Sequence, residues 1–293
     1  MPIKTISKIL EKARDERYAV GCFNIVNMES FEAVLEAAEE NQSPVIFAIA
    51  QIHLPYINMN RMVPMMKAAI EASEIDGAIL LDHAYDKEVV EDAINSGMNG
   101  VMFDISMLKY DEHVSKMKEM VAFCQSKGVE VEGELGFVGR ASGSKDYEAE
   151  KAMKANFQDK PLFTSPIEAK EYIEETGVSC LAVSIGNTHG QYKATANLQF
   201  DLLSSINSLA SKPLVMHGSS GISNEDLKEA VKRGICKVNY YTGLSKAAVD
   251  EIRITLENDP TWKDYHPLMK IGKSAMKAVV SSKIKVLGSA FKC

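Results

Sequence analysis

The sequence predicts an α/β fold in which a single barrel of eight parallel strands spans residues 1–293, with extra helices at both ends. Eight short apolar runs alternate with segments of helical periodicity, which is typical of parallel βαβ units. No linker or low-complexity stretch interrupts this alternation, and 293 residues suffice for a barrel of about 250 residues with appended helices. The pattern favours a (β/α)8, or TIM, barrel, although periodicity alone also allows an open doubly wound sheet.

The predicted elements follow in a regular order. Charges interrupt every apolar run of residues 1–18, so an amphipathic helix is predicted there rather than a signal peptide. The predicted strands are residues 19–25, 45–50, 77–83, 100–106, 130–136, 180–186, 213–218 and 237–242. Polar residues mark predicted helix starts at Asn27 or Ser30, Asp86, Ser165–Pro166 and Ser223. Glycine marks predicted helix ends at Gly97, Gly177 and Gly234.

Two segments depart from the repeat. Residues 137–165 form a long connection after the fifth predicted strand, and connections of this length commonly act as lids or binding loops. We expect them to form a mobile active-site loop. Residues from about 258 to 293 are expected to form a C-terminal helical extension and a place for subunit contacts.

Composition argues against several classes of partner. The net charge is −7, and no stripe of lysine and arginine is present that could neutralise nucleic acid or an anionic membrane. No apolar stretch approaches the roughly 18 residues of a membrane span. The five cysteines are far apart and form no C-x-x-C pair, which favours a reducing compartment. The protein is therefore expected to be cytoplasmic.

Three histidines fall at or just after the carboxyl ends of predicted strands. His83 closes residues 77–83, His189 follows residues 180–186, and His217 closes residues 213–218. Functional groups of a parallel barrel gather at this end, and three imidazoles with an open fourth position are a common catalytic zinc site. A lone strand histidine is more often a core residue, so the hypothesis depends on all three together. The other histidines, His53, His113 and His266, are expected to be surface or structural residues.

Glycine follows two of these histidines. Gly190 and Gly218 allow close backbone approach and positive φ, which suits loops that bind an anion through N–H groups. A phosphate held by the last loops recurs in such barrels. Residues that would complete a phosphate site are Lys193, Ser220, Asn239 and Thr242. The alternative is that the glycines only make tight turns.

Carboxylates also lie near strand ends. Asp82 directly precedes His83 and is the best candidate for proton transfer, because its neighbour would face a metal. Asp104 is expected to orient other groups, and Glu134 is a further buried carboxylate that needs a partner.

The chain resembles the class II, metal-dependent ketose-bisphosphate aldolases, a family that includes fructose- and tagatose-bisphosphate aldolases. The resemblance covers nearly the whole chain and is carried by AVGCFNIVNMES, LLDHA, VEGELG, SIGNTHGQYK, PLVMHGSSGI and ICKVN. It implies a lyase that cleaves a phosphorylated ketose into dihydroxyacetone phosphate and an aldehyde. Such a lyase would act in carbohydrate metabolism, for example in glycolysis. It also implies a homodimer or homotetramer.

The resemblance assigns roles residue by residue. It implies that His83, His189 and His217 bind one catalytic Zn²⁺, with Glu134 as a secondary ligand or neighbour. It leaves room for a second metal or a monovalent cation, and imidazoles would also accept Co²⁺ or Fe²⁺. Asp82 would exchange a proton with the C4 hydroxyl. The residues implied to contact substrate are Asn24, Gly190, Lys193, Gly218, Ser220, Asn239 and Thr242.

The chain departs from the family pattern on the aldehyde side. Ser142 stands where a lid carboxylate moves the C3 proton, and the candidates to replace it are Asp146, Tyr147, Glu148 and Glu150. Tyr241 stands where an aspartate contacts substrate, and Ala50 replaces a hydroxyl residue. No clear arginine for a distal phosphate is present. The departures leave open fructose or tagatose 1,6-bisphosphate and other ketose 1-phosphates as substrates.

Two further classes of function stay in view. One is a zinc hydrolase on the same barrel, which commonly adds acidic bridging ligands. The other is a phosphosugar-binding barrel that is catalytically impaired, and Ser142 is its main support.

Overall fold

A closed barrel of eight parallel strands forms the centre of the molecule in a computed structural model, which describes residues 3–140, 163–190 and 196–293. Its strands are β1 (Val20–Asn24), β2 (Val45–Ala50), β3 (Gly77–Ala84), β4 (Gly100–Phe103), β5 (Glu130–Leu135), β7 (Cys180–Val183), β9 (Leu214–Met216) and β10 (Ile235–Tyr240). Each strand pairs in parallel with its neighbours in chain order, and β10 closes the ring on β1. The predicted TIM barrel is confirmed.

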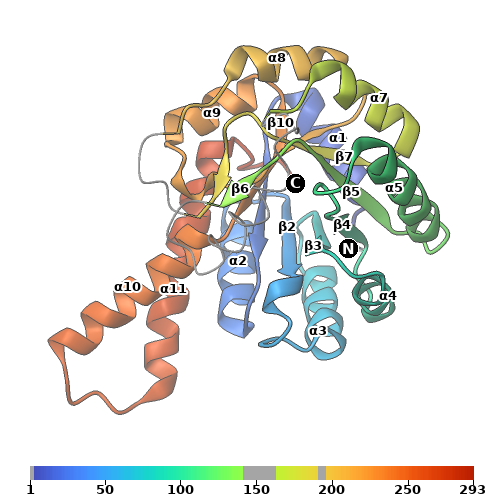
Figure 1. Cartoon of the computed structure of the whole chain (residues 1–293). Coiled ribbons are helices and arrows are strands. Elements are labelled where there is room, and N and C mark those ends of the chain that lie inside the picture. The colour runs from blue at the N-terminus through green and yellow to red at the C-terminus, as the bar shows by residue number, and fades with distance from the viewer. Residues whose placement is uncertain (1–2, 141–162, 191–195) are drawn as a thin grey trace.

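Helices surround the strands (Figure 1). They are α1 (Ile6–Glu16), α2 (Met28–Glu40), α3 (Met59–Ala72), α4 (Lys87–Ser96), α5 (Tyr110–Gln125), α7 (Pro166–Thr176), α8 (Phe200–Leu209), α9 (Asn224–Lys232), α10 (Thr242–Asn258) and α11 (Tyr265–Leu287). Short 3₁₀ turns, η1 (Gln51–His53) and η2 (Ser219–Gly221), follow β2 and β9. No helix in the described ranges is long and apolar enough to cross a membrane.

Most predicted helix signals lie at the helix ends. Asn27 and Ser30 act together, because Asn27 Oδ1 accepts from the Ser30 backbone while the Ser30 hydroxyl accepts from the Asn27 backbone. Ser165 and Ser223 cap α7 and α9 through their side chains. Asp86 occupies the N-cap position of α4 without capping it, since its carboxylate accepts from Gln51 Nε2 instead.

Several predicted boundaries were wrong by a few residues. The last strand ends at Tyr240, so Thr242 is the first residue of α10 rather than part of a strand. The helix α9 is capped by Arg233, with Gly234 one residue further on. The segment predicted as a C-terminal helical extension contains α11, which forms a helical hairpin with α10. This hairpin extends away from the barrel (Figure 1).

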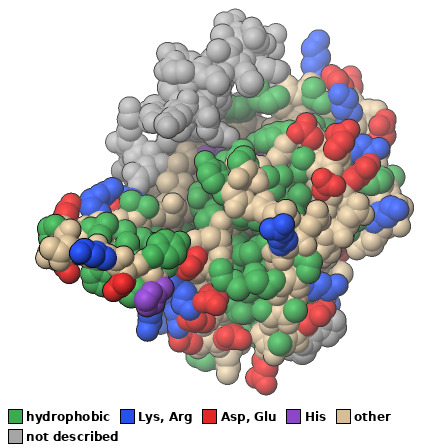
Figure 2. Space-filling model, turned by 90° about the horizontal axis from the view of Figure 1, so that it is seen from below, with side chains coloured by type: hydrophobic (Ala, Val, Ile, Leu, Met, Phe, Trp, Pro, Cys, Tyr) green, Lys and Arg blue, Asp and Glu red, His purple; other side chains and the backbone are tan. Residues whose placement is uncertain are grey.

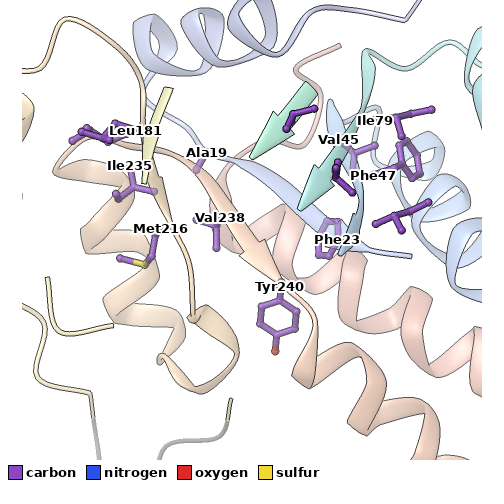
Figure 3. Packing of buried hydrophobic residues seen from close by; sticks show 14 of the residues in the cluster. Ala19, Phe23, Val45, Phe47, Ile79, Leu181, Met216, Ile235, Val238 and Tyr240 are labelled. Carbon is purple, nitrogen blue, oxygen red and sulfur yellow. The ribbon is translucent and has the colours of Figure 1, made fainter. Parts of the chain in front are cut away.

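The core divides into two apolar clusters. The outer cluster joins the strands to the surrounding helices, and Phe23, Phe47, Ile79 and Tyr240 belong to it (Figure 3). The inner cluster joins α1 to alternate strand positions such as Val20, Cys22, Ile46 and Leu80. The apolar face of α1 therefore packs against the interior of the barrel, which leaves the carboxyl ends of the strands for polar groups.

Candidate active site

A break in strand regularity lets two consecutive residues of β3 reach the same site. Successive strand residues normally point to opposite faces. The pairing of β3 with β4 shifts between Leu81 and Ala84, and His83 has a φ of 48°. Such a φ is strained for a histidine, and strained backbone often lies at functional sites. Because of this shift, Asp82 and His83 both take part in the polar cluster described below.

The three predicted metal ligands lie together. One nitrogen each from His83, His189 and His217 falls within 4.8 Å of the others. His189 reaches the group on β8 (Thr188–His189), a two-residue strand that pairs with β6 (Gly139–Arg140) outside the barrel. This small ladder was not predicted, since two-residue strands have no recognisable periodicity.

Carboxylates hold the outer nitrogens of two of these rings. Asp104 Oδ2 lies 2.8 Å from His83 Nδ1, and Glu132 Oε1 lies 2.9 Å from His217 Nε2. The remaining nitrogens, His83 Nε2 and His217 Nδ1, face each other at 3.2 Å. Metal-binding histidines commonly have such carboxylate partners, which fix the ring and its tautomer. Asp104 thus has the orienting contact that the sequence predicted, whereas the role of Glu132 was missed.

The charges at the site favour a bound cation. Burial alone would lower the pKa of His83, but Asp82, Asp104 and Glu134 raise it to about 10. Burial and the nearby His83 lower the pKa of His217, although Glu132 opposes this. One histidine therefore attracts positive charge while another stays neutral. This donor set fits a divalent metal ion such as Zn²⁺, which takes neutral imidazole nitrogens and can displace the proton from His83.

Asp82 is held by two asparagines. Asn24 Nδ2 donates to Asp82 Oδ2 at 2.8 Å, and Asn239 Nδ2 donates to Asp82 Oδ1 at 3.1 Å. Burial would raise the pKa of Asp82, but His83, His217 and Lys237 lower it below its ordinary value. The carboxylate is therefore ionised and fixed in direction. Both asparagines were predicted to contact substrate, and in this structure their amides contact Asp82.

A fully buried ion pair underlies the site. Lys237 Nζ lies 2.7 Å from Glu132 Oε2, and both side chains have zero exposure. The same ammonium donates to Asn239 Oδ1 at 2.7 Å. A connected set of contacts thus runs from His217 through Glu132, Lys237 and Asn239 to Asp82. The sequence signal was a lysine inside the apolar strand ICKVN, because lysine is almost never fully buried unless it is paired.

Glu134 lies near the histidines without joining them. Its carboxylate is not part of the three-histidine group. Burial and the neighbouring Asp104 raise its pKa well above the ordinary value, and its Oε2 has no hydrogen-bond partner among the described residues. Its role as a secondary ligand or neighbour of a metal ion stays a prediction.

The predicted phosphate residues gather at the ends of β9 and β10. A Cβ at Gly218, which has a φ of 67°, would lie 2.3 Å from the carbonyl oxygen of Thr188, so only glycine fits. Ser220 Oγ accepts from the Gly243 backbone at 3.2 Å, which joins η2 to the start of α10 beside Thr242. Gly190 has a φ of 92° after His189. Lys193 lies outside the described residues, as do Ser142 and the lid candidates Asp146, Tyr147, Glu148 and Glu150.

The remaining histidines differ from one another. His113 is buried and lies 2.8 Å from the Tyr172 hydroxyl, which is a structural contact. His266 is exposed on α11. His53 is only 8 % exposed and packs against Tyr241 at the barrel end that carries the site.

Three imidazoles backed by carboxylates at the carboxyl ends of barrel strands, next to an ionised aspartate, define a metal-dependent barrel enzyme. The model of the class-II fructose-bisphosphate aldolase family matches residues 4–292, so the chain belongs to that family. It is a class II aldolase, a lyase that acts on carbon–carbon bonds, and enzymes of this class are generally metal-dependent.

Solved structures of aldolases are similar to this chain along nearly its whole length. The YdjI aldolase from Escherichia coli K12 is 30 % identical, with a TM-score of 0.85 over 100 % of this chain and 99 % of that one. A protein from Coccidioides immitis assigned as a fructose-1,6-biphosphate aldolase is 25 % identical, with a TM-score of 0.85 over 98 % and 97 %. Fructose-bisphosphate aldolase from Campylobacter jejuni is 22 % identical, with a TM-score of 0.82 over 100 % and 97 %, and supports the fold alone.

Proposed function

We propose that the chain cleaves a phosphorylated ketose between C3 and C4, giving dihydroxyacetone phosphate and an aldehyde. The observation that carries this proposal is the position of Asp82, which is fixed by two asparagines next to the three-histidine group. The candidate substrates are fructose or tagatose 1,6-bisphosphate and other ketose 1-phosphates.

Each described group has a task in this reaction. Asp82 takes the proton of the C4 hydroxyl as the C3–C4 bond breaks, and the bonding electron pair passes to the dihydroxyacetone phosphate half. His83, His189 and His217 would hold a divalent ion, for which zinc is the first choice, and such an ion polarises a ketone as a Lewis acid. The backbone around Gly190 and Gly218, with Ser220 and Thr242, would bind the phosphate. The group that protonates C3 is expected on the loop at residues 137–165.

The test is release of dihydroxyacetone phosphate from each candidate ketose, measured with a coupled assay before and after treatment with a chelator. We expect at least one ketose to be cleaved, with activity lost on chelation and restored by Zn²⁺. Cleavage that persists in metal-depleted protein would contradict the role of the histidines. Bound metal with no cleavage of any ketose would favour a barrel that only binds phosphosugars.

We also infer that the chain forms a homodimer or homotetramer through the α10–α11 hairpin. Of the 17 residues of α10, only Leu244 is buried, while Val249, Ile254 and Leu256 are exposed, as is Tyr265 of α11. Figure 2 shows apolar side chains gathered on this projecting arm. Exposed apolar surface of this kind often marks a protein interface.

Changing Ile254 and Leu256 together to glutamate is expected to produce monomers, because burying two unpaired carboxylates in an interface is costly. Size-exclusion chromatography with light scattering would measure the mass. The control is Ile167→Glu on α7, which alters an even more exposed apolar residue away from the hairpin. A wild-type chain with the monomer mass of 32.2 kDa would overturn the inference.

We infer a reducing compartment from the wide spacing of the five cysteines, which form no C-x-x-C pair. All are free thiols, and Cys22, Cys124, Cys180 and Cys236 are buried.

A further inference from the structure

Two aromatic rings meet across the end of β1. His53 lies on η1, which follows β2, and Tyr241 follows β10. The strands β2 and β10 flank β1 in the barrel, so both rings stand beside the end of β1, where Asn24 contacts Asp82. The ring centroids are 4.6 Å apart at an angle of 54°. Tyr241 and His53 therefore form one continuous surface, which we call the aromatic wall.

The aromatic wall lies near Asp82, the residue that is proposed to act on the C4 hydroxyl of the substrate. Under the proposed function, Asp82 takes the proton of the C4 hydroxyl, so C4 and the rest of the aldehyde half lie beside Asp82. Asp82 pairs in register with Ala50 of β2, and His53 follows Ala50 by three residues, which places His53 near this carboxylate. The aromatic wall is thus placed beside the part of the substrate that carries C4.

His53 has an unused hydrogen-bonding atom. Its side chain is more than nine-tenths buried, and its Nδ1 has no partner among the described residues. Leaving a buried polar nitrogen unpaired costs about 1–3 kcal/mol, so a ligand hydroxyl that pairs with it is favoured. Burial lowers the pKa of His53, so the ring is neutral and can accept from or donate to a hydroxyl.

Among the described residues, no lysine or arginine is joined to His53 or Tyr241 by a cation–π contact or an ion pair. Besides burial, the described group that shifts the pKa of His53 is Asp82. The described groups that shift the pKa of Tyr241 are Ser245 and Tyr56. None of these is a lysine or arginine, which a phosphate needs as a partner when it leaves water. Ala50, at the end of β2 just before η1, adds only an apolar methyl group.

We propose that His53 and Tyr241 are specificity-determining residues that bind an uncharged, hydroxylated aldehyde half, so that the substrate is a ketose 1-phosphate without a second phosphate. This inference rests on the proposed function and narrows its candidate substrates. The rings pack against the carbon chain of the aldehyde, and His53 binds one of its hydroxyls. An aldehyde with its own phosphate places an unpaired charge against the aromatic wall.

The experiment uses the condensation direction, with dihydroxyacetone phosphate and either D-glyceraldehyde or D-glyceraldehyde 3-phosphate. These two aldehydes differ only by the phosphate. We expect the metal-loaded enzyme to show a kcat/KM for glyceraldehyde at least equal to that for its phosphate. A preference of about tenfold or more for the phosphorylated aldehyde would overturn the proposal, because that difference requires a cation at the aldehyde end.

Variants separate binding from structural damage. His53→Ala and Tyr241→Ala are each expected to lower kcat/KM for glyceraldehyde about tenfold, whereas Tyr241→Phe keeps the ring and most of the activity. Ile167→Ala on α7 is the control for a surface change. The second readout is exchange of the C3 proton of dihydroxyacetone phosphate with deuterated water, which needs no aldehyde.

Deuterium exchange distinguishes a role of His53 and Tyr241 in aldehyde binding from a failure of the proposed aldolase reaction. If it stays within about twofold in the His53 and Tyr241 variants while condensation falls, these residues act on the aldehyde half. Equal loss of exchange and condensation would assign them a structural role and overturn the inference. A wild-type enzyme that neither exchanges nor condenses would instead contradict the proposed function itself.

Discussion

Replacing His189 with alanine is expected to abolish metal binding and turnover together. A catalytic site with three imidazoles that loses one of them retains too few ligands for tight binding of a divalent ion. His83 and His217 are less suitable for this test, because they pair with the buried carboxylates of Asp104 and Glu132. Removing either of those histidines would leave a buried carboxylate without its partner and could unfold the chain.

The measurement is metal content by mass spectrometry alongside cleavage activity, with circular dichroism as the check on folding. His266→Ala is the matched control, because this histidine is exposed on α11. We expect about one metal ion per chain in the wild type and in the control, and almost none in His189→Ala. Activity that survived in the metal-free variant would show that the histidines do not hold the catalytic group.

The fold was predictable because its signals are local. Each buried strand is a short apolar run, and some of the following helices begin at a polar cap, as α2 does at Asn27 with Ser30. The errors fell at ends, such as Thr242, where an apolar run continues past the last strand pairing and into a helix. Sequence pattern alone does not locate the residue at which pairing stops.

The site was predictable only in part. The three histidines stand out because strand ends gather at one end of a barrel. Other features depend on contacts between segments far apart in the chain. The shift at His83 has no local sequence mark, and the pairing of Glu132 with Lys237 joins residues of β5 and β10 across the barrel interior. The contact of His53 with Tyr241 likewise joins the two loops that flank β1, so His53 looked like an ordinary loop residue.

Asp82→Asn is expected to lower kcat by about 10²–10⁴-fold while metal content is retained. The amide keeps the shape of the carboxylate but cannot accept the C4 hydroxyl proton. Asn24 and Asn239 both donate to Asp82, so the new NH₂ group faces one donor, and a loss of roughly 1–3 kcal/mol in the free energy of unfolding should accompany the change. Metal content, kcat and the denaturant midpoint measure the three effects separately.

Asp104→Asn is the matched comparison, because Asp104 is also a carboxylate of the site but contacts His83. Its Oδ2 lies 2.8 Å from His83 Nδ1. It holds the ring rather than the substrate, so its loss should weaken metal affinity by about 10–100-fold and leave kcat nearly normal when metal is saturating. If Asp82→Asn instead lost metal and recovered full kcat in excess Zn²⁺, Asp82 would be a positioning residue like Asp104, and the base for C4 would lie elsewhere. The opposite responses of these two carboxylates thus separate proton transfer from ligand orientation.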